Sequence, residues 1–173
     1  MVENADTSAS AASSGDGSSP LAASGPSNLR VDFYIVEDPS SSARLKLACK
    51  LAEKAYLASQ KVLVWHTDAT ELRDFDDMLW TFNDGSFVPH EALPANGSPA
   101  GETPVYLSAG VALSANVDII INLAPDLPPG LSQTVRVVEI IDGDDTRRRA
   151  GRARFKAYRE LGVQPASHNI RAD

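Results

Sequence analysis

The feature that most constrains the fold is a strand–helix–strand pattern within residues 31–65. VDFYIV at 31–36 and KVLVW at 61–65 are short, β-rich apolar runs. Ser41 or Ser42 can cap a helix between them, and that helix extends to about residue 59. Its apolar stripe consists of Leu47, Ala48, Leu51, Ala52 and Ala55. Two strands joined by one such helix form a right-handed βαβ unit, so the pattern predicts a parallel sheet.

The rest of the chain extends this pattern. Apolar residues at core spacing predict a second helix over 68–82, and three β-rich runs predict strands over 104–108, 117–123 and 134–141. A last helix is expected over 142–162. The chain has 173 residues, 43% of them hydrophobic, which suits one domain with a substantial core. We therefore expect a single α/β domain over 29–162, with a mostly parallel sheet of about five strands flanked by helices.

Both ends of the chain differ in composition from this domain. Residues 1–28 are rich in Ser, Ala and Gly, and such a segment buries too little apolar surface to offset the entropy of ordering it. We interpret them as a disordered extension that lacks the basic start and apolar centre of a signal peptide. Residues 163–173 are expected to form a loosely held C-terminal tail.

The sequence also bears on the compartment. No apolar run approaches the roughly 20 residues that span a bilayer. Cys49 is the single cysteine, which agrees with a reducing environment and rules out an internal disulfide. We expect a cytoplasmic protein without membrane contact.

Motifs for catalysis or cofactor binding are missing. The first strand-to-helix turn, EDPSSSARL, has no glycine, whereas a Rossmann-like dinucleotide site needs a glycine-rich loop there. His66, His90 and His168 have no metal-ligand spacing to one another or to Cys49. Cys49 lies among helix formers and is interpreted as buried core. The sequence therefore predicts a protein without cofactor or metal and favours a non-catalytic role.

The last predicted helix concentrates positive charge in an acidic chain. The formal net charge is −7, yet no acidic residue lies between Arg147 and Arg159. This helix holds seven of the 16 Lys and Arg residues, namely Arg147, Arg148, Arg149, Arg152, Arg154, Lys156 and Arg159. Asp142 or Asp144 can cap it, and capping explains these acids and Asp145 better than a Mg²⁺ site does. Such a helix is expected to contact something negative.

Helical spacing sorts this helix into two faces. Arg148, Arg152, Phe155 and Arg159 share one face, with Lys156 beside them. The residues expected to pack inward are Ala150, Ala153, Ala157 and Leu161. An aromatic ring within a row of arginines suits a ligand that is both negative and apolar. The alternative is a solvated basic face from which Phe155 dips into the core.

A second cluster of large rings lies at the end of the helix predicted over 68–82. Trp80, Phe82 and Phe87 make this the most aromatic stretch of the chain. Part of it must belong to the core, but three rings at a helix end and loop exceed what a small core hides. Residues 91–103, rich in Pro, Gly and Ala, are expected to form an exposed loop.

Several short segments, in this order and spacing, resemble the chi subunit family of bacterial DNA polymerase III. The resemblance covers about residues 32–162. It is carried by FYIV, LACKLAEKA, KVLVW, LWTF, SFVPH, INLAPDLP and RARFKAYRELG. Chi subunits are non-catalytic parts of the clamp-loader assembly with one α/β domain, so the resemblance implies the same fold class.

The resemblance also implies two partners. Chi subunits bind the acidic, phenylalanine-terminated C-terminal tail of single-stranded DNA-binding protein, and through another face they bind the psi subunit. The matching positions for the tail site are Ile141, Arg148, Arg152, Phe155, Lys156 and Arg159. Trp80 and Phe87 match the psi contact. DNA would then be reached mainly indirectly.

Two other classes of function remain alternatives. The basic helix can bind single-stranded nucleic acid directly, with arginines on phosphates and Phe155 stacked on a base. The overall acidity of the chain opposes an extended DNA channel. A small enzyme with a pocket at the carboxyl ends of the strands is the other alternative, and the missing catalytic motifs oppose it.

Overall fold

The protein is described by a computed structural model that covers residues 28–134 and 136–171. The predicted extension, apart from Asn28, lies outside the described residues. Across the described part, the elements follow one another as β1 (Arg30–Val36), α1 (Ser41–Leu57), β2 (Val62–His66), α2 (Ala69–Thr81), β3 (His90–Ala92), β4 (Val105–Ala109), β5 (Ile119–Asn122), β6 (Arg136–Ile141), α3 (Asp145–Glu160) and β7 (Ala166–Ile170).

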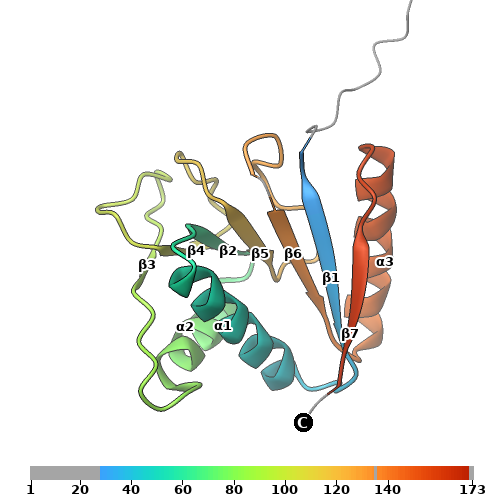
Figure 1. Cartoon of the computed structure of the whole chain (residues 1–173), viewed down its shortest axis with the longest axis horizontal. Helices are drawn as coiled ribbons and strands as arrows, with labels where there is room; N and C mark the ends of the chain where they lie inside the picture. Colours follow the sequence, from blue (N-terminus) through green and yellow to red (C-terminus); the bar gives the residue numbers. More distant parts are fainter. Residues whose placement is uncertain (1–27, 135, 172–173) are drawn as a thin grey trace, which may run out of the picture.

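The strands form one sheet in the order β3-β4-β2-β5-β6-β1-β7, and each neighbouring pair described in it is parallel. Helices α1 and α2 cover one face and α3 lies on the other, behind β1 and β7 (Figure 1). The single α/β domain and the parallel sheet are confirmed. The described sheet has seven strands where about five were predicted.

The core has two layers because side chains alternate across the buried strands. Val62 and Val64 of β2 face α1 and α2, where they meet Ala52 and Phe75. Leu63 faces the opposite side, in the cluster that contains Phe33, Ile120 and Tyr158. β2 is buried along its whole length, as expected for a central strand of a parallel sheet.

Polar side chains set the helix starts. Ser40 caps α1, one residue before the predicted Ser41 or Ser42, and accepts from the Ala43 amide. Asp68 caps α2 and Asp144 caps α3. Each cap accepts a hydrogen bond from a first-turn amide that has no partner within the helix.

The two strands that the sequence did not predict are short and lie at the edges of the sheet. β3 has three residues and overlaps the start of segment 91–103, which was expected to be a loop; its His90 pairs with Val105. β7 lies within the expected C-terminal tail, and its residues are mostly exposed. Its pairing with β1 places residues 166–170 at the end of the sheet next to α3 (Figure 1).

Candidate functional site

Helix α3 is fixed on the sheet by a buried carboxylate. Glu139 of β6 is fully buried, and its Oε2 accepts from Arg154 Nε at 2.9 Å. Its Oε1 accepts from Tyr158 Oη at 2.7 Å and from Asn122 Nδ2 at 2.9 Å. Burial raises the pKa of Glu139, whereas the Arg154 charge and the three donors act in the opposite direction. Burial beside Glu139 also raises the pKa of Tyr158, which therefore stays a donor.

This network corrects the predicted inward face of α3. The buried residues of the helix are Gly151, Arg154 and Tyr158. Of the residues expected there, Ala153 is exposed, and the others are only half-buried: Ala150, Ala157 and Leu161. The prediction failed because apolarity was taken as the signal for burial, whereas a buried carboxylate draws Arg154 inward.

The seven cations of α3 divide into engaged and available groups. Arg147 forms an ion pair with the buried Asp142, and Arg154 is held by Glu139. Lys156 lies 4.0 Å from Glu160 on the exposed side of the helix. In the described part of the chain, the exposed Arg149, Arg152 and Arg159 form no ion pair, and neither does Arg148, whose Nε donates to the Asp142 carbonyl at 3.3 Å.

A cavity of about 270 Å³ opens beside α3. The rings of Phe33 and Phe155 form part of its wall, with centroids 5.2 Å apart. Two guanidinium-bearing side chains, Arg148 and Arg152, complete the wall on the helix side. The full lining consists of Phe33, Ile35, Ile141, Arg148, Gly151, Arg152, Phe155 and Ser167.

This cavity brings together four of the six residues predicted for the tail site: Ile141, Arg148, Arg152 and Phe155. Lys156 and Arg159 are exposed on α3 and do not line it. The sequence prediction missed four lining residues, Phe33, Ile35, Gly151 and Ser167. Phe33 and Ile35 had a detectable signal, because they alternate in β1 and so point to the same face of the sheet.

Strand β7 supplies one wall of the cavity through Ser167 and is held by a cluster on the other face of the sheet. The buried Asp32 carboxylate is within 2.9 Å of His168 Nε2 and 2.8 Å of Arg136 Nε. Tyr34 stacks on His168 at a centroid distance of 4.9 Å. Burial alone raises the pKa of Asp32, but the contacts from His168 and Arg136 outweigh it, and the net shift is downward. The ionised carboxylate thus ties β7 to β1.

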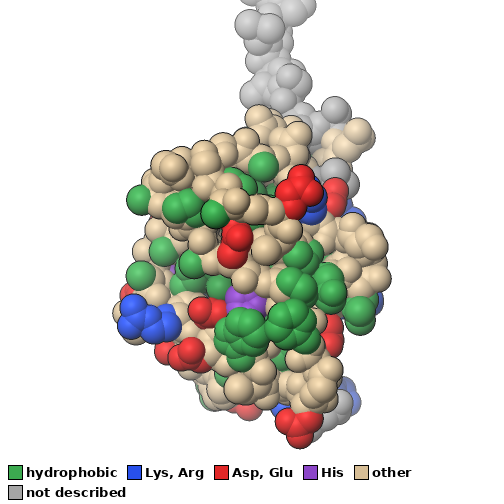
Figure 2. All heavy atoms as spheres, turned by 90° about the vertical axis from the view of Figure 1, so that its left-hand side faces the viewer, with side chains coloured by type: hydrophobic (Ala, Val, Ile, Leu, Met, Phe, Trp, Pro, Cys, Tyr) green, Lys and Arg blue, Asp and Glu red, His purple; other side chains and the backbone are tan. Residues whose placement is uncertain are grey.

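A patch of exposed rings lies at the opposite end of the sheet. Trp80 is 53% exposed and Phe87 is 63% exposed, with centroids 5.6 Å apart. Figure 2 looks onto this side and shows hydrophobic side chains gathered around a histidine, with acidic side chains nearby. The ring of His90 lies 4.6 Å from Trp80 and its nitrogens contact the Val88 carbonyl and Asp76, each at 2.7 Å. Phe82, the third ring of this stretch, packs against the core.

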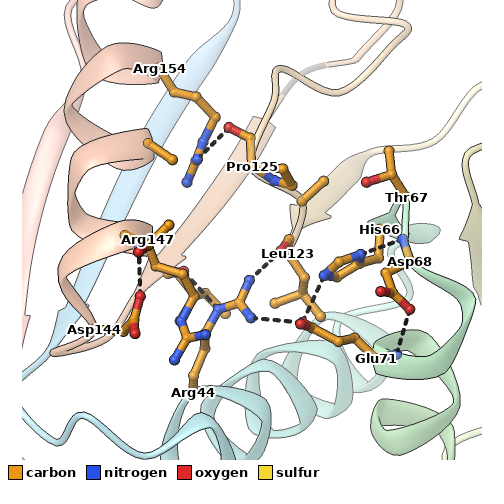
Figure 3. A pocket seen from close by; sticks show the side chains of 14 residues that line it. Arg44, His66, Thr67, Asp68, Glu71, Leu123, Pro125, Asp144, Arg147 and Arg154 are labelled. Carbon is orange, nitrogen blue, oxygen red and sulfur yellow. Dashed lines mark hydrogen bonds and ion pairs between the residues drawn. The ribbon is translucent and has the colours of Figure 1, made fainter.

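A second cavity, of about 470 Å³, lies at the carboxyl ends of β2, β5 and β6 (Figure 3). This is where the small-enzyme alternative expected a pocket. Its charged side chains contact partners of their own. Arg44 is buried and donates to the carbonyls of Ile140 and Leu123, while Glu71 lies 3.7 Å from it. His66 contacts Glu71 at 2.9 Å.

The state of His66 in this cavity follows from its surroundings. Burial lowers its pKa, the Arg44 charge adds to this, and Glu71 acts in the opposite direction. Its Nδ1 accepts a hydrogen bond from the Asp68 amide at 2.8 Å, so Nε2 carries the proton and donates a hydrogen bond to Glu71. The histidine therefore connects the end of β2 with the start of α2.

Cys49 has the environment expected for core. It belongs to α1 and is fully buried, and burial raises the pKa of its thiol to about 12. Over residues 28–134 and 136–171, no three His, Cys, Asp or Glu side chains gather in a way that suits a metal ion. Nor does any helix in these ranges combine the length and apolarity needed to cross a bilayer.

Known proteins resemble this chain in fold and in sequence. The fold resembles part of the crystal structure of T4 UvsW, with a TM-score of 0.59 and 10% sequence identity, covering 84% of this chain and 42% of that one. That likeness concerns the open α/β fold alone. The family model described as "DNA polymerase III chi subunit, HolC" matches residues 29–166. The chain therefore belongs to the DNA polymerase III chi subunit family.

Curated relatives agree with this assignment. DNA polymerase III subunit chi of Pseudomonas aeruginosa is 33% identical over 141 residues, which cover 82% of this chain and 96% of the relative. The Escherichia coli subunit is 28% identical over 135 residues, which cover 75% of this chain and 90% of the relative. The Haemophilus influenzae subunit is 24% identical over 139 residues, which cover 80% of this chain and 95% of the relative. The predicted family is thus confirmed, and with it a role as an accessory subunit of a DNA polymerase III.

Proposed function

We propose that this chain is a non-catalytic subunit that links the clamp loader of DNA polymerase III to single-stranded DNA-binding protein. It does so by binding the acidic, Phe-ended C-terminal tail of that protein. The observation that carries the proposal is the cavity beside α3, which combines an apolar wall with Arg148 and Arg152. Neither arginine has a carboxylate partner among the described residues.

Each part of such a tail has a counterpart on this surface. The terminal ring fits between Phe33, Ile141 and Phe155, which are apolar and already packed. The terminal carboxylate is bound by Arg152 or Arg148, because a guanidinium can donate two parallel hydrogen bonds to a carboxylate. The upstream aspartates are attracted by the exposed Lys156 and Arg159. A small interface of this kind suits micromolar affinity, about −8 kcal/mol.

Substitution of Arg152 tests the assignment of the carboxylate contact. Arg152→Ala is expected to weaken binding of an acidic Phe-ended peptide by about 30-fold, roughly 2 kcal/mol, because it removes the charged partner of a terminal carboxylate that is desolvated against the cavity. Arg149→Ala is the matched control. It removes the same charge from another exposed position of the same helix, and Arg149 does not line the cavity. We expect a loss below about fivefold for this control. Calorimetric titration of both variants with one peptide measures the difference.

Equal losses for the two variants would indicate general electrostatic attraction and would contradict a defined carboxylate contact. Fluorescent single-stranded DNA, titrated against the same proteins, examines the nucleic-acid alternative. Tight DNA binding that both substitutions weaken equally, together with weak peptide binding, would favour a direct nucleic-acid module instead.

The aromatic patch is the proposed contact for a psi subunit. Trp80 and Phe87 expose large apolar area. Trp80 lies beside His90 of β3, and β3 and β7 are the two opposite edge strands of the sheet. Exposed rings of this size are typical of protein–protein contacts. The two surfaces therefore allow one chain to hold two partners at once.

Phe87→Ala separates a contact role from a core role. Because its side chain is 63% exposed, we expect the free energy of unfolding to change by less than about 1 kcal/mol, whereas a core phenylalanine would cost about 3–5 kcal/mol. Co-purification with a psi subunit should fall at the same time. Urea unfolding supplies the stability, and a loss of several kcal/mol would place Phe87 in the core instead.

A further inference from the structure

Gly151 occupies a helix position at which glycine is normally unfavourable. It lies in the middle of α3 and is buried, and glycine destabilises a helix interior relative to alanine. It also lines the cavity beside α3. A glycine at this point needs a reason in the packing around it.

That reason is the side chain of Ile141. A Cβ atom built on Gly151 would lie 2.1 Å from Cδ1 of Ile141 and 3.1 Å from its Cγ1. Ile141 therefore fills the space that the first carbon of any other side chain at position 151 would take. Ile141 is itself 7% exposed, packed in the core cluster on the α3 face, and part of the same cavity wall.

A residue larger than glycine would change the cavity rather than only the helix. Protein interiors are close-packed, so a displaced methyl group moves to the nearest unfilled space. For Ile141 Cδ1, the unfilled space next to it and to Gly151 is the cavity of about 270 Å³ that both residues line. Gly151 thus keeps Ile141 pressed against the helix and leaves the cavity deep.

We propose that Gly151, by seating Ile141 against α3, sets the depth of the cavity and selects peptides that end in a full aromatic ring over those that end in a smaller side chain. This inference rests on the proposed function and names the residue pair that determines its specificity.

The test compares acidic peptides that differ only in their last residue, Phe or Val, on the full chain. Gly151→Ala is expected to weaken the Phe-ended peptide by about tenfold or more and the Val-ended peptide by about threefold or less, because small volume changes in apolar pockets have effects of this size. The double variant Gly151→Ala/Ile141→Val lacks Cδ1, the atom in conflict. It is expected to recover Phe binding to within about threefold of the original chain.

The outcomes separate this inference from the function on which it rests. If the unchanged chain does not bind the Phe-ended peptide, the proposed function fails. If it binds but Gly151→Ala weakens both peptides equally, weakens neither, or is not rescued by Ile141→Val, only the depth assignment is overturned. If the Gly151→Ala variant does not fold, the single variant Ile141→Val tests the same proposal. It deepens the cavity, so a Trp-ended peptide should gain at least about threefold relative to the Phe-ended one; an unchanged ratio also overturns the proposal.

Discussion

Glu139→Ala is expected to lower the free energy of unfolding by about 3–5 kcal/mol. The substitution leaves Arg154 as a buried cation whose remaining contact is the Pro125 carbonyl, and it removes the acceptor of the Tyr158 hydroxyl. Breaking one side of a buried ion pair is costly because the other charge stays out of water without a partner. For a domain of this size such a loss is a large fraction of the whole stability.

Asp145→Ala is the matched comparison, since it also removes one carboxylate, but from the exposed first turn of α3. Its expected cost is below about 1 kcal/mol, the usual value for an acid near a helix start. Urea unfolding of both variants measures the two costs. Similar small costs would mean that Glu139 does not anchor the helix and that α3 is held by apolar packing alone.

The anchoring network matters for the cavity because it sets the rotation of α3. With Arg154 and Tyr158 turned toward Glu139, the neighbouring Arg148, Arg152 and Phe155 lie at the cavity. A folded Glu139 variant is therefore expected to lose peptide affinity as well as stability, although none of its atoms lines the cavity.

The sequence predicts the centre of this fold well and its edges poorly. Central strands such as β2 are buried on both faces, so their apolar runs are strong signals. Edge strands carry no such signal. β3 has three residues, and β7 is mostly exposed and is held by backbone pairing and by the Asp32–His168 contact. Neither kind of contact is visible in a hydrophobic pattern.

The same limit applies to the candidate site. Spacing on a helix is enough to group Arg148, Arg152 and Phe155, because residues three and four apart share a face. Ser167 approaches them from a strand whose position depends on pairing with β1. The sequence prediction also missed the role of Arg154. One clue was present, because Glu139 is an acid flanked by apolar residues within β6 and needs a buried cation.

In the proposed function, the cavity beside α3 accepts a terminal phenylalanine together with its carboxylate. Removing only that last residue from the acidic peptide takes away the ring and shifts the carboxylate away from Arg148 and Arg152. Burying a phenylalanine side chain contributes about 1.5–3 kcal/mol, and the misplaced carboxylate adds to the loss. The expected effect is thus a weakening of about 100-fold or more.

The most direct measurement is calorimetric titration of the full chain with the intact peptide and with the peptide that lacks its final phenylalanine, at one fixed salt concentration. The proposal predicts micromolar binding of the intact peptide and a loss of about 100-fold on truncation. Equal affinities would contradict it, because they would mean that α3 attracts the aspartates only by its charge and that the cavity takes no part.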